Sequence, residues 1–184
     1  MPVQTPICDF GKKALPFELK STDNKIISLD DIKGENGTLI MFICNHCPYV
    51  KAVTKEIVED CNELKKIGIN SVAICSNDAV NYPDDSFDNM IKFSKDNQFS
   101  FPYLHDETQD IAKAYDAVCT PDFFGYDKDL ELQYRGRLRE LKNFVPVKDG
   151  KSDLLKAMKQ IAETGKGPQD QIPSAGCGIK WKYD

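Results

Sequence analysis

The sequence predicts an α/β fold in which helices flank one central mixed sheet. An apolar run at 39–43 is typical of a buried strand, and apolar residues then recur at steps of three and four between 50 and 64, as on one face of a helix. A second apolar run at 70–75, again followed by helical spacing, repeats this order and favours parallel strands. Two short runs at 122–126 and 130–135 enclose a polar turn and predict an antiparallel pair. We therefore expect a sheet with a parallel start and an antiparallel finish.

The other elements follow in chain order. Residues 15–33 predict a hairpin that turns at 21–24. The helix that begins at Pro48 should end near Ile67, because Gly68 suits the position after a helix C-terminus. The remaining expected elements are a helix from Asp84 capped by Asp85 or Ser86, a strand at 101–104, a helix at 107–115, and a last helix carrying Leu154, Leu155, Met158 and Ile161.

Composition limits the class of protein. The chain has 184 residues, of which 41% are apolar and 29% charged, as in folded globular proteins. We expect one domain over 1–184, with a core at about 15–163 and a tail at 164–184 whose order the sequence does not indicate. The net charge of −5 disfavours nucleic acid or an anionic membrane as partner. No stretch approaches the roughly 18–20 apolar residues of a membrane span, and no signal-peptide pattern opens the chain, so we expect a cytoplasmic protein.

The seven cysteines differ in their surroundings. Their odd number and scattered spacing do not indicate a disulfide framework, so each thiol is either a buried apolar group or a group kept for redox or metal chemistry. Cys47 stands where the predicted strand 39–43 gives way to the helix that Pro48 opens. A thiol at a helix N-terminus lies near unpaired N–H groups and the positive end of the helix dipole, which favour the thiolate. Cys47 is therefore the candidate nucleophile.

Several stretches together resemble the thioredoxin-like redoxin family, the group that includes alkyl hydroperoxide reductase and thiol-specific antioxidant proteins. They are residues 17–34, Phe42-Ile43-Cys44-Asn45-His46-Cys47-Pro48-Tyr49, Cys119-Thr120-Pro121, residues 124–136, and the tail at 173–182. The resemblance implies a thioredoxin-like fold with an N-terminal β-hairpin and an inserted helix. It also implies that Thr120 and Pro121 form a cis-proline loop packed against the reactive cysteine, with Pro48 beside it.

The sequence departs from the patterns of this family at the reactive turn. Cys47 takes the first place of a thioredoxin-type Cys-x-x-Cys turn, but Val50 takes the second, so the visible pair Cys44 and Cys47 is shifted by three residues. True peroxiredoxins have Thr or Ser where this chain has Cys44, and they lack the Thr-Pro loop.

Three thiols are candidates to resolve an oxidised Cys47, as is an external thiol. Cys119 precedes the Thr-Pro step, Cys44 is close in sequence but needs an intervening turn, and Cys177 needs the tail to fold back over the site. His46 either stabilises the thiolate and moves protons or faces water.

The resulting hypothesis is a thiol-dependent oxidoreductase without a cofactor, which reduces peroxides or disulfides and is recycled by a thioredoxin-type or small-thiol reductant. The sequence leaves the choice of substrate and the oligomeric state open. One alternative is a module that binds Zn or Cu(I) through Cys44, His46, Cys47 and either Cys119 or Cys177. Another is a redox-inactive scaffold. The three arginines, 135, 137 and 139, fall at strand period and form either an anion or partner site or a solvated face.

Overall fold

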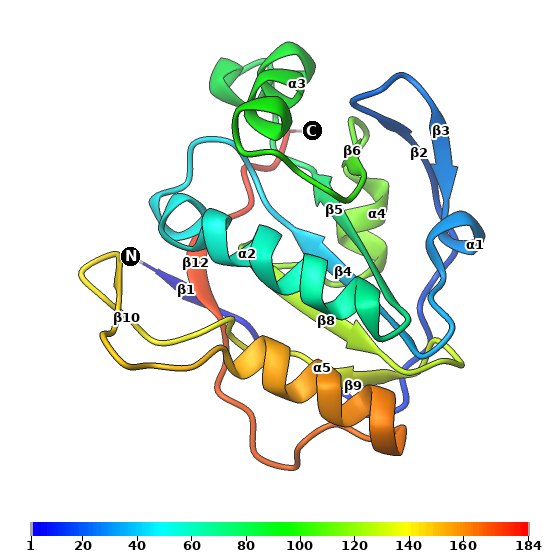
Figure 1. Ribbon diagram of the computed structural model, residues 1–184. Helices are drawn as coiled ribbons and strands as arrows, with labels where there is room; N and C mark the ends of the chain where they lie inside the picture. The colour runs from blue at the N-terminus through cyan, green and yellow to red at the C-terminus, as the bar shows by residue number, and fades with distance from the viewer. Residues whose placement is uncertain (1, 184) are drawn as a thin grey trace.

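The computed structural model describes residues 2–183 and shows a seven-stranded mixed sheet with helices on both faces (Figure 1). The strand order is β3-β2-β6-β5-β4-β8-β9. The strands are β2 (Glu18–Ser21), β3 (Ile26–Ser28), β4 (Gly37–Phe42), β5 (Ile69–Cys75), β6 (Tyr103–His105), β8 (Asp122–Tyr126) and β9 (Leu132–Tyr134). Strands β4, β5 and β6 run parallel, and β8 and β9 are antiparallel to their neighbours. The predicted parallel start and antiparallel finish are confirmed.

The helices match the predicted pattern, with differences at their ends. They are α1 (Leu29–Ile32), α2 (Pro48–Lys66), η1 (Pro83–Asp85), α3 (Phe87–Asp96), α4 (Asp110–Ala114) and α5 (Asp153–Thr164). Helix α3 begins at Phe87 and not at Asp84, because Ser86 is extended and its side chain accepts from the N–H of Asn89. Among the described helices, none combines the length and the apolar character needed to span a bilayer.

The alternating side chains of β4 divide the core into two clusters. Leu39 and Met41 face the cluster beneath α2, α3 and α5, whereas Ile40 and Phe42 face the cluster beneath α1 and α4. All four side chains are fully buried or nearly so. Strand β4 is therefore the central strand, and its carboxyl end leads directly to Cys44 and Cys47.

The tail is ordered, which the sequence did not indicate. Strand β12 (Ala175–Gly178) pairs antiparallel with β7 (Cys119–Thr120) on one edge and with β1 (Val3–Gln4) on the other. In Figure 1, β12 (red) runs past the N-terminal end of α2 (cyan). A short hairpin of β10 (Leu141–Lys142) and β11 (Val145–Pro146) lies between β9 and α5 in sequence. The tail thus folds back over the end of the sheet where Cys47 lies.

Candidate active site

Cys47 lies at the junction between β4 and α2, directly before the first helical turn. Its backbone is extended (φ −66°, ψ 125°), and Pro48 opens the helix, a position where proline gives up no hydrogen bond. The sulfur is therefore at the end of the helix where N–H groups are unpaired and the dipole is positive. The residue is 0% exposed, so a substrate cannot reach the sulfur unless a neighbouring segment moves.

Several S–H and N–H groups lie near the Cys47 sulfur. The Cys44 thiol stabilises the Cys47 thiolate most, followed by the Cys177 thiol and the backbone N–H groups of Val50 and Cys177. These donors outweigh the effect of burial and lower the pKa of Cys47 to about 5. When protonated, the thiol has an acceptor in the Thr120 carbonyl oxygen at 3.3 Å. The donors favour the thiolate at neutral pH.

Cys44 is the first of these donors. The chain bends at Asn45 and His46, which is the intervening turn that brings Cys44 and Cys47 together. Hydrogen bonding to Cys47 and burial raise the pKa of the Cys44 thiol, so it keeps its proton. Its sulfur also lies 3.4 Å from Thr120 Oγ1.

The Thr120–Pro121 peptide bond is cis, the isomer that the resemblance implies. Thr120 contacts both neighbouring cysteines, with its carbonyl oxygen toward Cys47 and its hydroxyl toward Cys44. The Cys119 thiol instead lies 3.6 Å from the Pro121 carbonyl oxygen, and burial raises its pKa. The thiols that lower the pKa of Cys47 are thus those of Cys44 and Cys177 rather than that of Cys119.

Cys177 reaches the site from the far end of the chain. In the β12–β7 pair, Cys177 stands opposite Thr120. Partial burial and the hydrogen bond to Cys47 raise the pKa of the Cys177 thiol to about 11. Cys177 remains partly exposed, unlike Cys44 and Cys47. It is therefore the thiol of this group that solvent can reach.

A buried carboxylate lies beneath His46. Asp85 of η1 is fully buried, and its Oδ2 lies 2.6 Å from His46 Nδ1. The Asn45 N–H donates to Asp85 Oδ1 at 2.8 Å, and Asn77 Nδ2 donates to Oδ2 at 2.9 Å. The sequence suggested Asp85 only as a helix cap. No local pattern predicts that the loop containing it returns to the site.

Cys44, His46 and Asp85 together could hold a metal ion. Their ligand atoms all lie within 4.8 Å of one another. Sulfur, imidazole and carboxylate ligands in one group suit zinc. Asp85 was not among the expected ligands, and the group contains none of the expected ligands Cys47, Cys119 and Cys177.

The arginines do not form a common surface. Each one is paired with a different carboxylate: Arg135 with Asp122 at 2.9 Å, Arg137 with Asp153 at 2.7 Å and Arg139 with Glu56 at 3.1 Å. The interpretation as a solvated face is wrong for Arg135, which is buried and also lies over the Phe124 ring. Strand β9 ends at Tyr134, so the strand period does not continue through these residues.

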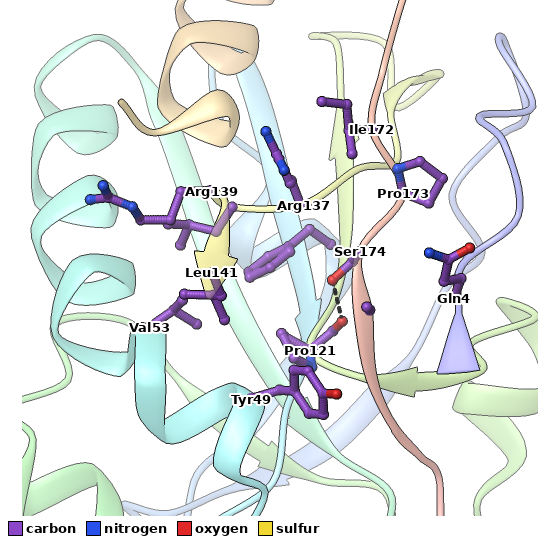
Figure 2. Close-up of a pocket in the computed structure, with 13 residues that line it drawn as sticks. Gln4, Tyr49, Val53, Pro121, Arg137, Arg139, Leu141, Ile172, Pro173 and Ser174 are labelled. Carbon is purple, nitrogen blue, oxygen red and sulfur yellow. Dashed lines mark hydrogen bonds between the residues drawn. The ribbon is translucent and has the colours of Figure 1, made fainter. Parts of the chain in front are cut away.

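A cavity of about 220 Å³ opens beside the cis loop (Figure 2). Tyr49 and Val53 of α2, Leu141 of β10 and the segment 172–175 line it, together with Pro121. As Figure 2 shows, the Ser174 hydroxyl donates to the Pro121 carbonyl oxygen, at 2.8 Å. The cavity therefore lies alongside the strand that approaches Cys47.

A helix-capping cysteine next to a cis-proline loop, on a mixed sheet of this order, defines a thioredoxin-like redoxin. The chain belongs to the AhpC/TSA family, whose pattern matches residues 10–135. This membership supports a thiol-dependent redox role in general. A search of curated proteins finds no match.

Solved structures show the same fold. An uncharacterized conserved protein from Geobacillus kaustophilus is 45% identical, with a TM-score of 0.93 over 100% of this chain and 98% of that one. A hypothetical protein from Sinorhizobium meliloti 1021 is 32% identical, with a TM-score of 0.90 over 98% of each chain. A thiol:disulfide interchange protein of the thioredoxin family from Chlorobium tepidum TLS is 16% identical, with a TM-score of 0.64 over 83% of this chain and 97% of that one. The first two likenesses include the tail.

Proposed function

We propose that this chain is a thiol–disulfide oxidoreductase in which the Cys47 thiolate attacks a disulfide. The observation that carries the proposal is the place of Cys47 at the N-terminus of α2, where its sulfur lies 3.3 Å from the Thr120 carbonyl oxygen of the cis loop and its pKa is lowered to about 5. Such a thiol is ionised at neutral pH and is also a good leaving group. Cys61, by contrast, has the character of a structural cysteine, because burial raises its pKa to about 12.

The surroundings of Cys47 favour a disulfide over a peroxide. Reduction of a peroxide requires charged or polar donors aimed at the departing oxygen. Within residues 2–183, each of the three arginines is occupied by a carboxylate of its own, and none is hydrogen-bonded to Cys47. The donors at Cys47 are thiols and backbone N–H groups, which stabilise a sulfur anion.

The reaction proceeds in two exchanges. The Cys47 thiolate attacks one sulfur of the substrate disulfide, that S–S bond breaks, and the other substrate sulfur leaves as a thiolate. Cys177, after losing its proton to solvent, then attacks the Cys47 sulfur and expels the second substrate thiolate. The substrate gains two electrons, and the chain is left with a Cys47–Cys177 disulfide. A thioredoxin-type dithiol or a small thiol reduces this disulfide at Cys177, the accessible sulfur.

The positions of the other thiols support this assignment of roles. Cys44 is almost fully buried, so a Cys44–Cys47 disulfide would leave both sulfurs out of reach of a reductant. Its proton instead stabilises the Cys47 anion, both before attack and when Cys47 is expelled. Cys119 makes no hydrogen bond to Cys47 and has a raised pKa.

Trapping of intermediates tests this proposal. The full chain is reduced, mixed with a small aromatic disulfide and analysed by mass spectrometry after proteolysis. We expect the wild type to form a Cys47–Cys177 disulfide, Cys177→Ser to accumulate the mixed disulfide on Cys47, and Cys47→Ser to form neither. A Cys44–Cys47 or Cys47–Cys119 disulfide in the wild type would show that Cys44 or Cys119, and not Cys177, is the resolving residue. Faster oxidation of Cys47 by hydrogen peroxide than by the disulfide would overturn the choice of substrate. If Cys47 reacts with neither the disulfide nor hydrogen peroxide, the alternative of a redox-inactive scaffold is supported.

One observation favours a second candidate function, the binding of a soft metal. The fully buried Asp85 has His46 Nδ1 2.6 Å from its Oδ2, and the Cys44 sulfur lies close to both. A buried carboxylate needs compensating charge, which a divalent ion also supplies. Metal analysis of untagged protein tests this function. Stoichiometric zinc or copper that is lost in Asp85→Asn supports it, and absence of metal after dialysis against zinc excludes it.

We propose a cytoplasmic location, because the seven cysteines are all free thiols in the structure and a reducing compartment would keep them so.

A further inference from the structure

Strand β12 covers the sulfur that must react. We propose that Cys47 acts on an extended polypeptide segment that replaces β12 on the edge of β7, and that this segment carries its cysteine directly after a glycine and two residues after an apolar side chain. The inference rests on the proposed disulfide exchange at Cys47. It adds the class of substrate and the residues of this chain that select it.

The pairing of β12 shows how such a segment docks. Cys177 stands opposite Thr120 and Gly178 opposite Cys119 in an antiparallel register. In this register Cys177 lies close enough to Cys47 for each thiol to shift the pKa of the other. A cysteine at the position of Cys177 is therefore in line for exchange with Cys47, whichever strand presents it.

The position before this cysteine has room only for glycine. A Cβ atom on Gly176 would lie 2.1 Å from the Thr120 carbonyl oxygen and 2.7 Å from the Thr120 carbonyl carbon. Both are backbone atoms of the loop that leads into the cis peptide, so they cannot turn away as the end of a side chain can. On the same strand, a Cβ on Gly178 would meet only a Val3 methyl, at 3.4 Å. The close approach is thus specific to the residue that precedes the cysteine.

The next position outward faces the cavity. Ala175 lines the space beside Tyr49, Val53 and Leu141, together with the segment 172–174 (Figure 2). Its methyl group leaves about 220 Å³ of the cavity open. A larger apolar side chain at this position of a docked segment would fill the space and bury its own surface.

Strand β12 is held in a way that allows it to detach from β7. Its side chains are small, and its attachment consists chiefly of hydrogen bonds, including those of Ser174 to Thr5 and Pro121 and that of the Ile179 N–H to Val118. Ile179, directly after the strand, is a buried apolar side chain. Segments with few buried apolar contacts open at low free-energy cost. A competing strand can make the same backbone bonds to β7. When this segment unpairs from β7, still bound to Cys47 through the mixed disulfide, β12 returns, and Cys177 attacks the Cys47 sulfur and releases the segment as a thiolate.

Peptides test the selection. Each peptide carries its cysteine as a mixed disulfide with an aromatic thiol whose release is followed by absorbance, and the protein is the full reduced chain. The sequences compared are Leu-Gly-Cys-Gly, Leu-Ala-Cys-Gly and Ala-Gly-Cys-Gly, with capped ends. We expect alanine in place of glycine to slow release by about tenfold, as for overpacking of a tight site. We expect alanine in place of leucine to slow it several-fold. Equal rates for all three peptides would overturn the proposal.

Two matched variants test the displacement of β12. Gly176→Ala forces β12 away from the loop, and Gly178→Ala serves as its control. We expect alkylation of Cys47 by iodoacetamide to be about tenfold faster in Gly176→Ala and unchanged in Gly178→Ala. Cys61 reports global unfolding, and its labelling should stay equally slow in both variants. Equal Cys47 labelling in the wild type and both variants would overturn the displacement.

Disulfide exchange at Cys47 and selection of the peptide segment can fail separately. If Cys47 is alkylated only at alkaline pH, with the profile of an ordinary thiol, the proposed function fails. If Cys47 is reactive at neutral pH but the peptides are not distinguished, disulfide exchange stands and the selection by the Thr120 loop and the cavity is wrong.

Discussion

Replacement of Cys44 by alanine should raise the pKa of Cys47. The hydrogen bond from the Cys44 thiol is the largest of the effects that bring the pKa of Cys47 to about 5 from the ordinary 9.0. Alanine removes this donor and leaves the N–H groups of Val50 and Cys177 in place. Serine at the same position keeps an O–H donor, so Cys44→Ser is the matched control.

The size of the change follows from the strength of this bond. A hydrogen bond to a charged group contributes about 1.5–3 kcal/mol, and 1.36 kcal/mol corresponds to one pH unit. The pKa of Cys47 should therefore rise by about 1–2 pH units in Cys44→Ala. At pH 5 the thiolate fraction then falls by roughly 5- to 50-fold, whereas at pH 8 it hardly changes.

The assay is the pH profile of Cys47 alkylation, followed by mass spectrometry of the peptide that contains it. Rates are compared between variants at each pH, so the common effect of burial under β12 cancels. We expect the profile of Cys44→Ala to move to higher pH and that of Cys44→Ser to stay close to the wild type. A midpoint in Cys44→Ala within about 0.3 pH units of the wild type would show that Cys44 is not the donor.

Three further predictions concern stability, measured by chemical denaturation. Arg135→Met should destabilise the fold by about 3–5 kcal/mol, because it leaves the buried Asp122 carboxylate without its partner; a loss below about 1 kcal/mol contradicts this. Ile57→Ala should cost about 2–5 kcal/mol, since Ile57 is fully buried on the inner face of α2; a loss below about 0.5 kcal/mol, as at an exposed position, contradicts this. Burial raises the pKa of Asp60 to about 6 from 3.8, against the hydrogen bond from Ser152. Between these values the native state binds more protons than the unfolded state, so the free energy of unfolding falls as pH rises from about 4 to about 6. Asp60→Asn should remove roughly 1–2 kcal/mol of this dependence, and an unaltered pH profile contradicts the assignment.

The local pattern of the sequence predicted the centre of the fold. The runs at 39–43 and 70–75 became β4 and β5, and the stripe between 50 and 64 became the buried face of α2. These elements are predictable because their backbone hydrogen bonds and their burial repeat with a short period along the chain. The helix start at Pro48 was predictable from the same local pattern, and it puts Cys47 at the N-terminus of α2.

Residues whose surroundings come from distant segments were predicted poorly. Asp85 was expected as a helix cap, but it is buried next to His46, which comes from the loop between β4 and α2. Arg135 was expected on an open face or at a partner site, but it is enclosed against Asp122. Charged residues carry no periodic signal that separates a buried pair from a solvated one, because the difference lies in what packs around them.

The sequence by itself determined the α/β order, the position of Cys47 at the start of a helix and, through the resemblance, the loop at Thr120 and Pro121. Only the tertiary structure decided which thiol meets Cys47. The segment Ala175-Gly176-Cys177-Gly178 is too small and too weakly apolar to predict a strand. It becomes one because β7 and β1 offer unpaired backbone groups on both of its edges, and because glycine allows it to approach Thr120. Those partners are brought together by the packing of the rest of the chain.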